Sequence, residues 1–225
     1  MTVAFFIVGC IKSDDPNNGT ENNGGGHYDG NYEYVDLGLP SGTLWATFNV
    51  GANVPEGYGD YFAWGEVQPK DVYDVSTYKY CMGSHNSYTR YCQEVASGYN
   101  SYSDTLTILL AEDDAVTVNW GDEWRTPTKT EWIELKAHCT QRWTQLNGVN
   151  GFLLTANNGH SIFLPAAGCY SSSDLIEVGE RGGYWSSSLG ATYSAYDFDF
   201  YSGGSQLYHF YRELGRTVRG VRSRP

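Results

Sequence analysis

Tyrosine, aspartate and histidine alternate with phenylalanine in one segment near the C-terminus, YSAYDFDFYSGGSQLYHFYRE, residues 193–213. Successive side chains of an extended strand point to opposite faces, so Phe198 and Phe200 share one face. Asp197, Asp199 and Tyr201 then share the other face. Antibody loops use the same residue types, because a tyrosine brings a large contact area and a hydroxyl at low entropic cost. The segment predicts a recognition hairpin; the alternative is an ordinary strand in a chain with 19 tyrosines.

The other reactive residues do not form a recognisable catalytic or metal-binding pattern. The spacing of the five histidines is not that of metal ligands, and the serines of YWSSSL lack the Gly-x-Ser-x-Gly turn of a nucleophile elbow. The histidines are His27, His85, His138, His160 and His209. The sequence therefore predicts no catalytic residue, no cofactor and no metal site.

Four cysteines follow the N-terminal region, at positions 81, 92, 139 and 169. An even number in an exported chain permits disulfides. Cys81 and Cys92 flank a short polar loop and are the favoured pair, while four partly buried free thiols are the alternative. Neither Cys-x-x-Cys nor Cys/His spacing indicates zinc.

The composition limits both the fold and the partners. Aromatic residues make up 16% of the 225 residues and there are 27 glycines, which favours short strands and turns over long helices. A net charge of −12 argues against nucleic acid, because phosphate binding needs clustered basic residues. Five arginines cluster between 212 and 224, where we expect them to pair with the acidic excess or to flank a last strand.

The first residues, MTVAFFIVGC, are apolar over a stretch too short to span a bilayer as a helix. IVGC resembles a bacterial lipobox, in which Cys10 is acylated; the alternative is a start codon placed ahead of a buried strand. Residues 11–31 are rich in Gly and Asn and predict a flexible tether. The acidic residues directly after Cys10 resemble the export signal of Bacteroides surface lipoproteins. The expected location is the outer membrane or cell surface, held by lipid alone.

Residues 32–225 read as one domain of the α+β class. Thr128 and Glu131 have the spacing of a capping box, and Trp132, Leu135 and Cys139 follow on one face of that helix. AEDDAVTVNWG is a second short helix with Asp113 or Asp114 in its first turn. Three Asn-Gly pairs predict hairpin turns in 142–168, and 73–103 reads as loop.

Several motifs occur in order and resemble the major paralogous domain first named from Fibrobacter succinogenes. They are WRTPTKTEW (124–132), FLPAAG (163–168), GGYWSSS (182–188) and the final RTVRGVR, together with EYVDLGLPSGTLWAT, GDYFAWGE and NGVNG. The resemblance covers about residues 32–223. It implies a C-type lectin fold, with two short helices packed on twisted antiparallel sheets, many loops and neighbouring termini.

Two activities known for that fold fit this chain poorly. WRTPTKTEW is similar to the signature of formylglycine-generating enzymes, but those oxidases need paired cysteines near the C-terminal end, and this chain has none after Cys169. Calcium-dependent lectins use Glu-Pro-Asn or Gln-Pro-Asp, which Glu66–Asp71 misses because Lys70 separates Pro69 from Asp71. We therefore expect a binding protein and not an enzyme.

C-type lectin domains of this kind include the variable proteins of diversity-generating retroelements, whose last segment scatters among Asn, Tyr, Ser, Asp, His and Phe. The scaffold residues that the resemblance implies are Tyr184, Trp185, Ala195, Phe200, Arg212, Gly215, Val218 and Arg219. The residues that it implies for the binding face are Tyr193, Asp197, Asp199, Tyr201, Tyr208, His209, Phe210 and Tyr211. The expected ligand is a protein or glycan on another cell, phage or host surface. A fixed structural or adhesive module is the alternative, and a divergent enzyme ranks last.

Overall fold

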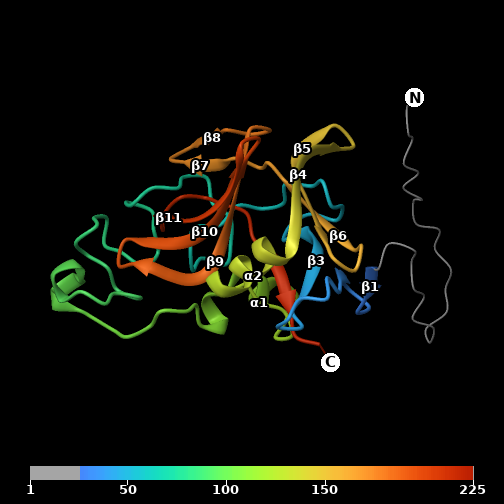
Figure 1. The fold of residues 1–225 in the computed structure, drawn as a ribbon. Helices are drawn as coiled ribbons and strands as arrows, with labels where there is room; N and C mark the ends of the chain where they lie inside the picture. The colour runs from blue at the N-terminus through green and yellow to red at the C-terminus, as the bar shows by residue number, and fades with distance from the viewer. Residues whose placement is uncertain (1–25, 225) are drawn as a thin grey trace.

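The computed structural model describes residues 26–224, which form an α+β fold dominated by antiparallel sheets (Figure 1). The first sheet has the order β1-β2-β3-β12, so the last strand pairs with β3 in the sheet that also holds the earliest described strands. Its strands are β1 (Gly26–Tyr28), β2 (Glu33–Val35), β3 (Leu44–Asn49) and β12 (Arg219–Arg222).

Two further three-stranded sheets and one short strand pair complete the β structure. The second sheet contains β4 (Cys139–Leu146), β5 (Val149–Ala156) and β6 (Ser161–Pro165). The third has the order β11-β10-β9 and contains β9 (Arg181–Ala191), β10 (Ser194–Tyr201) and β11 (Gly204–Tyr211). The pair consists of β7 (Cys169–Ser171) and β8 (Asp174–Ile176).

Two α-helices lie in the described part of the chain, α1 (Ala115–Trp120) and α2 (Lys129–His138). Asp114 caps α1 by accepting from the amides of Val116 and Thr117. The predicted capping box of α2 is confirmed, because Thr128 and Glu131 each accept from the other's backbone amide. Short 3-10 turns occur at Val95–Ser97, Tyr99–Ser101 and Ala111–Asp113.

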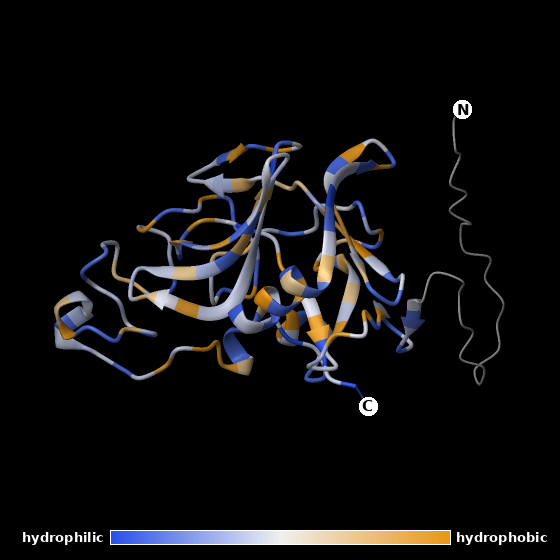
Figure 2. Ribbon diagram, in the orientation of Figure 1, coloured by the Kyte–Doolittle hydropathy of each residue, from blue (hydrophilic) through white to orange (hydrophobic). Residues whose placement is uncertain are grey.

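The apolar face of α2 packs between the first and third sheets. The Trp132 ring stacks on Phe198 of β10 at 4.9 Å between centroids, and it also lies 4.8 Å from the ring of Trp45 of β3. Leu135 is buried with it, as the sequence predicts, and Cys139 is also buried but begins β4, because the helix ends at His138. Figure 2 shows apolar residues gathered around the two helices and the strands beside them.

The Asn-Gly turns and the domain start differ in part from expectation. Asn147-Gly148 and Asn158-Gly159 do form the turns of β4–β5 and β5–β6, but Gly151 lies inside β5. The neighbouring strand explains why position 151 is glycine, since a Cβ on Gly151 would lie 2.3 Å from the Leu164 carbonyl oxygen. The folded part also begins before residue 32: β1 lies within the stretch predicted as tether, and Asp29 bonds the Trp124 indole. The predicted signal segment, Cys10 and the tether up to residue 25 lie outside the described residues.

The segment 73–103 lacks long helices and strands, as expected, yet five of its tyrosines are buried. Three of them, Tyr78, Tyr88 and Tyr91, surround the guanidinium of Arg212, which is itself inaccessible to solvent and lies 4.8 Å from the Tyr88 ring centroid. Arg212 donates to the Tyr78 hydroxyl and to the carbonyl oxygens of Tyr91, Thr192 and Arg90. This loop is therefore part of the core, held by the residue that follows the C-terminal hairpin.

Replacing Trp132 by Ala should lower the free energy of unfolding by about 3–5 kcal/mol, because it empties the space between β3 and β10. Ile133→Ala on the same helix is the matched control. Its side chain is 46% exposed, so we expect a change within about 0.5 kcal/mol. Chemical denaturation of both variants measures the difference, and equal stability of the two would contradict the assigned helix face.

Candidate binding surface on the C-terminal hairpin

The segment 194–211 forms the predicted β-hairpin with an uninterrupted register. Ser194 lies opposite Tyr211 at one end and Tyr201 opposite Gly204 at the other. Ser202 and Gly203 alone make the turn between the two strands. Strand β9 pairs with the other side of β10, so β10 is central and β11 is an edge strand.

The expectation that Asp197 and Asp199 face solvent is wrong. Both carboxylates are fully buried beneath arginines from distant positions. Arg216 Nη1 lies 2.7 Å from Asp197 Oδ2. Arg181 donates two hydrogen bonds to the carboxylate of Asp199 in a bidentate arrangement, with Nε 2.8 Å from Oδ2 and Nη2 2.8 Å from Oδ1. Both faces of β10 are therefore interior, since Phe198 on the opposite face packs under α2.

A glycine in β9 makes this arrangement possible. A Cβ on Gly183 would lie 1.7 Å from Arg216 Nη1, so a side chain there would displace the guanidinium from Asp197. Phe210 of β11 covers the same group from the outside, with its ring centroid 4.1 Å from the Arg216 guanidinium carbon. Phe210, predicted as a binding residue, is thus half-buried and closes the ion pair off from water.

Burial raises the pKa of Asp197 to about 7, against the opposing attraction of Arg216. Two atoms of this pair, Asp197 Oδ1 and Arg216 Nε, have no hydrogen-bond partner within the described residues. The ion pair is therefore incompletely satisfied, and its carboxyl sits where a change of pH within the neutral range alters its charge.

The remaining predicted residues do lie at the surface. Tyr201, Tyr208 and Tyr211 are each about half exposed, at 52%, 50% and 52%, and Tyr193 is 45% exposed. His209 is also exposed, and its ring stacks on Tyr208 at 5.4 Å. These five residues are called the aromatic rim below. Tyr208, His209 and Tyr211 lie on β11 and project from both of its faces, while Tyr201 ends β10 and Tyr193 precedes it. The predicted set therefore does not form a single face.

Two residues beside the rim, His85 and Glu213, were not predicted from the sequence as site residues. His85 lies 5.1 Å from the Tyr211 ring, and its Nε2 is 3.5 Å from Glu213 Oε1. Burial raises the pKa of Glu213, and its second oxygen has no partner in the described chain. Glu213 stands two residues after the hairpin, and this nearness in the chain was the signal that could have identified it. Nothing in the sequence links position 85 to the hairpin.

The predicted disulfide between Cys81 and Cys92 is wrong. Both are buried free thiols, as are Cys139 and Cys169. Cys81 Sγ donates to the Val75 carbonyl oxygen and Cys92 Sγ to that of Glu94, so local backbone acceptors take the place of a bond between them. Burial raises the pKa of all four thiols, for Cys139 to about 11, which keeps them protonated at neutral pH.

Other features of the described region offer less chemistry. No three His, Cys, Asp or Glu side chains among residues 26–224 come together in a way that could hold a metal ion. Glu66, from the near miss to a calcium motif, pairs with Lys70 at 2.9 Å. None of the described helices has the length and apolar character needed to cross a membrane.

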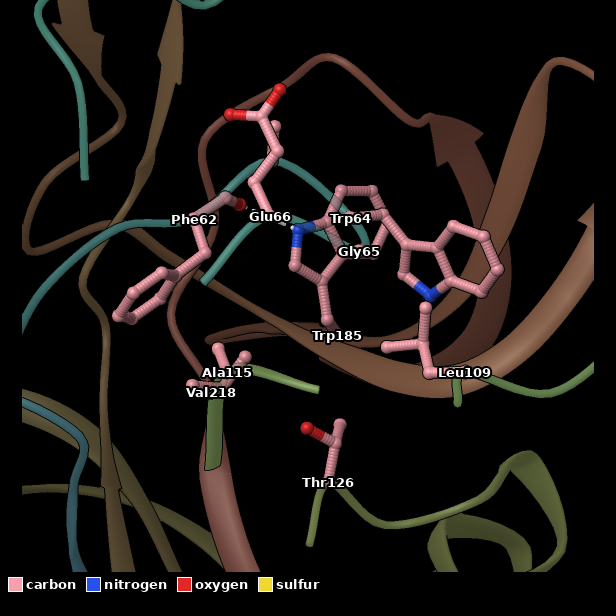
Figure 3. Close-up of a pocket in the computed structure, with 10 residues that line it drawn as sticks. Phe62, Trp64, Gly65, Glu66, Leu109, Ala115, Thr126, Trp185 and Val218 are labelled. Carbon is pink, nitrogen blue, oxygen red and sulfur yellow. Dashed lines mark hydrogen bonds between the residues drawn. The ribbon is translucent and has the colours of Figure 1, made fainter. Parts of the chain in front are cut away.

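One cavity lies in the core between the 62–66 segment, β9 and α1 (Figure 3). It has room for little more than one water molecule. Its two indoles are already engaged, since Trp64 Nε1 donates to the Ser186 carbonyl oxygen and Trp185 Nε1 to that of Phe62. The cavity is too small for a ligand larger than a water molecule, and the aromatic rim is the candidate surface.

Comparisons with protein-family models, with curated proteins and with solved structures found no match to this chain. The family resemblance and the C-type lectin fold therefore stay predictions that depend on the motifs.

Asp197→Asn should remove part of the pH dependence of stability. Because burial raises the folded-state pKa from 3.8 to about 7, the stability contributed by protonated Asp197 is fully present below pH 3.8. It is lost as the pH rises through 7, with a slope approaching about 1.4 kcal/mol per pH unit. The measurement is urea unfolding of both proteins from pH 4.5 to 7.5. The stability of the parent relative to Asp197→Asn should fall across this range, and parallel curves would contradict the assignment.

Proposed function

We propose that this protein binds a protein or glycan ligand through the aromatic rim of its C-terminal hairpin. The observation that carries the proposal is the contrast within one hairpin: β10 is buried on both faces up to Phe200, whereas β11 exposes Tyr208, His209 and Tyr211 in its second half. Large exposed aromatic side chains gathered in one place are typical of interaction sites.

The ion pairs that lie beneath the rim favour a rigid binding surface. The ion pairs of Asp197 with Arg216 and of Asp199 with Arg181 fix β10 against β9 and the C-terminal segment. Little conformational freedom is then lost from the backbone when a ligand binds, so more of the contact energy of the tyrosines is available as affinity.

The proposal includes a C-type lectin fold and a variable C-terminal segment. Two short helices, several antiparallel sheets, and the presence of the first and last described strands in one sheet support that fold. All eight residues that the resemblance implies for the scaffold, from Tyr184 to Arg219, are buried. The rim residues between them are exposed, so substitution there leaves the core intact. A near-copy of the coding stretch for 184–222 beside a reverse transcriptase gene, differing at adenines, is the genomic observation that tests diversification.

Exchanging Tyr201, Tyr208 and Tyr211 together for Ala should abolish ligand capture and leave folding intact. Each loss is expected to cost binding about 2 kcal/mol or more, against a stability change within about 0.5 kcal/mol for a surface position. Tyr99→Ala is the matched control, because Tyr99 is 44% exposed on a loop outside the hairpin.

The probes for this experiment are biotinylated surface extracts of bacterial and host cells and an immobilised glycan array. Thermal melts of the three proteins accompany the capture assay. Equal capture by the parent and the triple variant, with equal melts, would place the binding site elsewhere on the domain.

We also propose that Cys10 carries lipid and anchors the domain at the cell surface, on the strength of the IVGC motif and the polar stretch after it. Cys10→Ser should then abolish labelling by an alkyne-bearing fatty acid in bacterial cells and shift the protein from the membrane fraction to the soluble one. Retained label in the Ser variant would show that the lipid is elsewhere or that the motif is incidental.

A further inference from the structure

The edge strand β11 lacks the devices that usually protect an open sheet edge. Its eight residues, GSQLYHFY, include no Lys, Arg, Asp, Glu or Pro. Its register with β10 contains no bulge, whereas the pairing of β10 with β9 has two irregularities. Natural edges are kept from pairing with other chains by charges, prolines, bulges or short length, so an eight-residue uncharged edge is available for pairing.

The hydrogen-bond pattern shows which backbone groups face outward. The Arg212 amide donates to the Tyr193 carbonyl oxygen, next to the pair Ser194–Tyr211. Bonded pairs alternate along an antiparallel ladder, so the amides and carbonyls of Phe210, Tyr208 and Gln206 point to β10. Those of Tyr211, His209, Leu207 and Ser205 point away from it.

Contacts at both ends confirm this pattern and mark the length of the free ladder. Lys136 Nζ lies 2.6 Å from the outward carbonyl oxygen of Ser205, and the Leu214 amide donates to that of Tyr211. Between them, the amide and carbonyl groups of Leu207 and His209 and the amide of Tyr211 have no partner in the described chain. Donors and acceptors thus repeat about every 6.8 Å, the spacing of alternate residues in a strand.

We propose that this edge receives an extended peptide segment of another protein, which adds to the sheet as a strand beside β11. The inference rests on the proposed function and narrows its ligand to a polypeptide, because a peptide backbone matches this repeat of donors and acceptors and a glycan does not. The rim residues then contact side chains of the added strand, Tyr208 on one face of the sheet and His209 and Tyr211 on the other.

The net charge of this chain indicates which polypeptides could pair with the edge of β11. The formal net charge of −12 makes two copies of this chain repel one another and attracts a segment with basic residues. Because β11 itself is uncharged, the central residues of the segment are expected to be neutral, β-branched or aromatic, with lysine or arginine outside them.

A library of ten-residue peptides tests the proposal, with Lys at each end and alternating β-branched or aromatic residues in the centre. The full chain should select binders, and each selected peptide is then made in two forms. One form is N-methylated on the amides of one edge and the other form on those of the opposite edge. Because an added strand uses one edge alone, one form should bind as the parent peptide does and the other should lose at least about tenfold in affinity.

Substitutions at His209 test the same contact from the side of the protein. His209→Pro removes an outward amide and leaves the ladder to β10 complete, as edge strands tolerate. It should weaken peptide binding at least about tenfold beyond the loss caused by His209→Ala, which keeps the amide. Thermal melts of both variants confirm that they are folded at the assay temperature.

The outcomes separate this inference from the proposed function. Strand addition is overturned if both N-methylated forms bind equally, if Pro and Ala at 209 act alike, or if the library gives no binder. In each of these cases the triple tyrosine variant still reports on the rim as a binding surface. A concentration-dependent dimer that His209→Pro dissociates would make a second copy the occupant and overturn the choice of a foreign peptide.

Discussion

The burial of guanidinium groups from the C-terminal segment is the constraint on which this structure depends. Arg212 and Arg219 are inaccessible to solvent, and a buried charge is tolerated when every donor finds an acceptor. Arg219 bonds Asn49 Oδ1 and the carbonyl oxygens of Ala46 and Phe163, which joins the first sheet to the second. Arg212 joins the hairpin to the loop at 73–103. Hydrogen bonds of buried arginines thus join distant parts of the fold in addition to apolar contact.

Local chemistry made parts of the fold predictable from the sequence. The capping box of α2, the Asn-Gly turns at 147 and 158 and the pairing of β10 with β11 all follow from residues close together in the chain. The burial of Asp197 and Asp199 does not, because their partners stand at 216 and 181. Alternation separates the two faces of a strand, but it cannot say that a third element covers the polar one.

The tyrosines are a second example: their number is read from the sequence, but packing decides which of them are buried and which are exposed. Tyr61 and Tyr78 are buried because their hydroxyls donate to the carbonyl oxygens of Ala167 and Trp64, at 2.6 and 2.7 Å. Tyr201 and Tyr208 lie at the surface. Both groups look alike in the sequence, since the backbone acceptors that admit a tyrosine to the interior come from distant segments. The sequence could therefore predict which segment carries the rim, but not which residues of that segment are exposed.

The bonding of the buried arginines has an evolutionary consequence. Most acceptors of Arg212 and Arg219 are main-chain carbonyl oxygens, at Tyr91, Thr192, Arg90, Ala46 and Phe163. Every amino acid supplies such an oxygen, so neutral drift at these positions preserves the hydrogen bonds as long as the new side chain fits. A lineage that keeps these two arginines can in this way tolerate wide divergence of its other core residues, and the architecture can outlast recognisable sequence similarity.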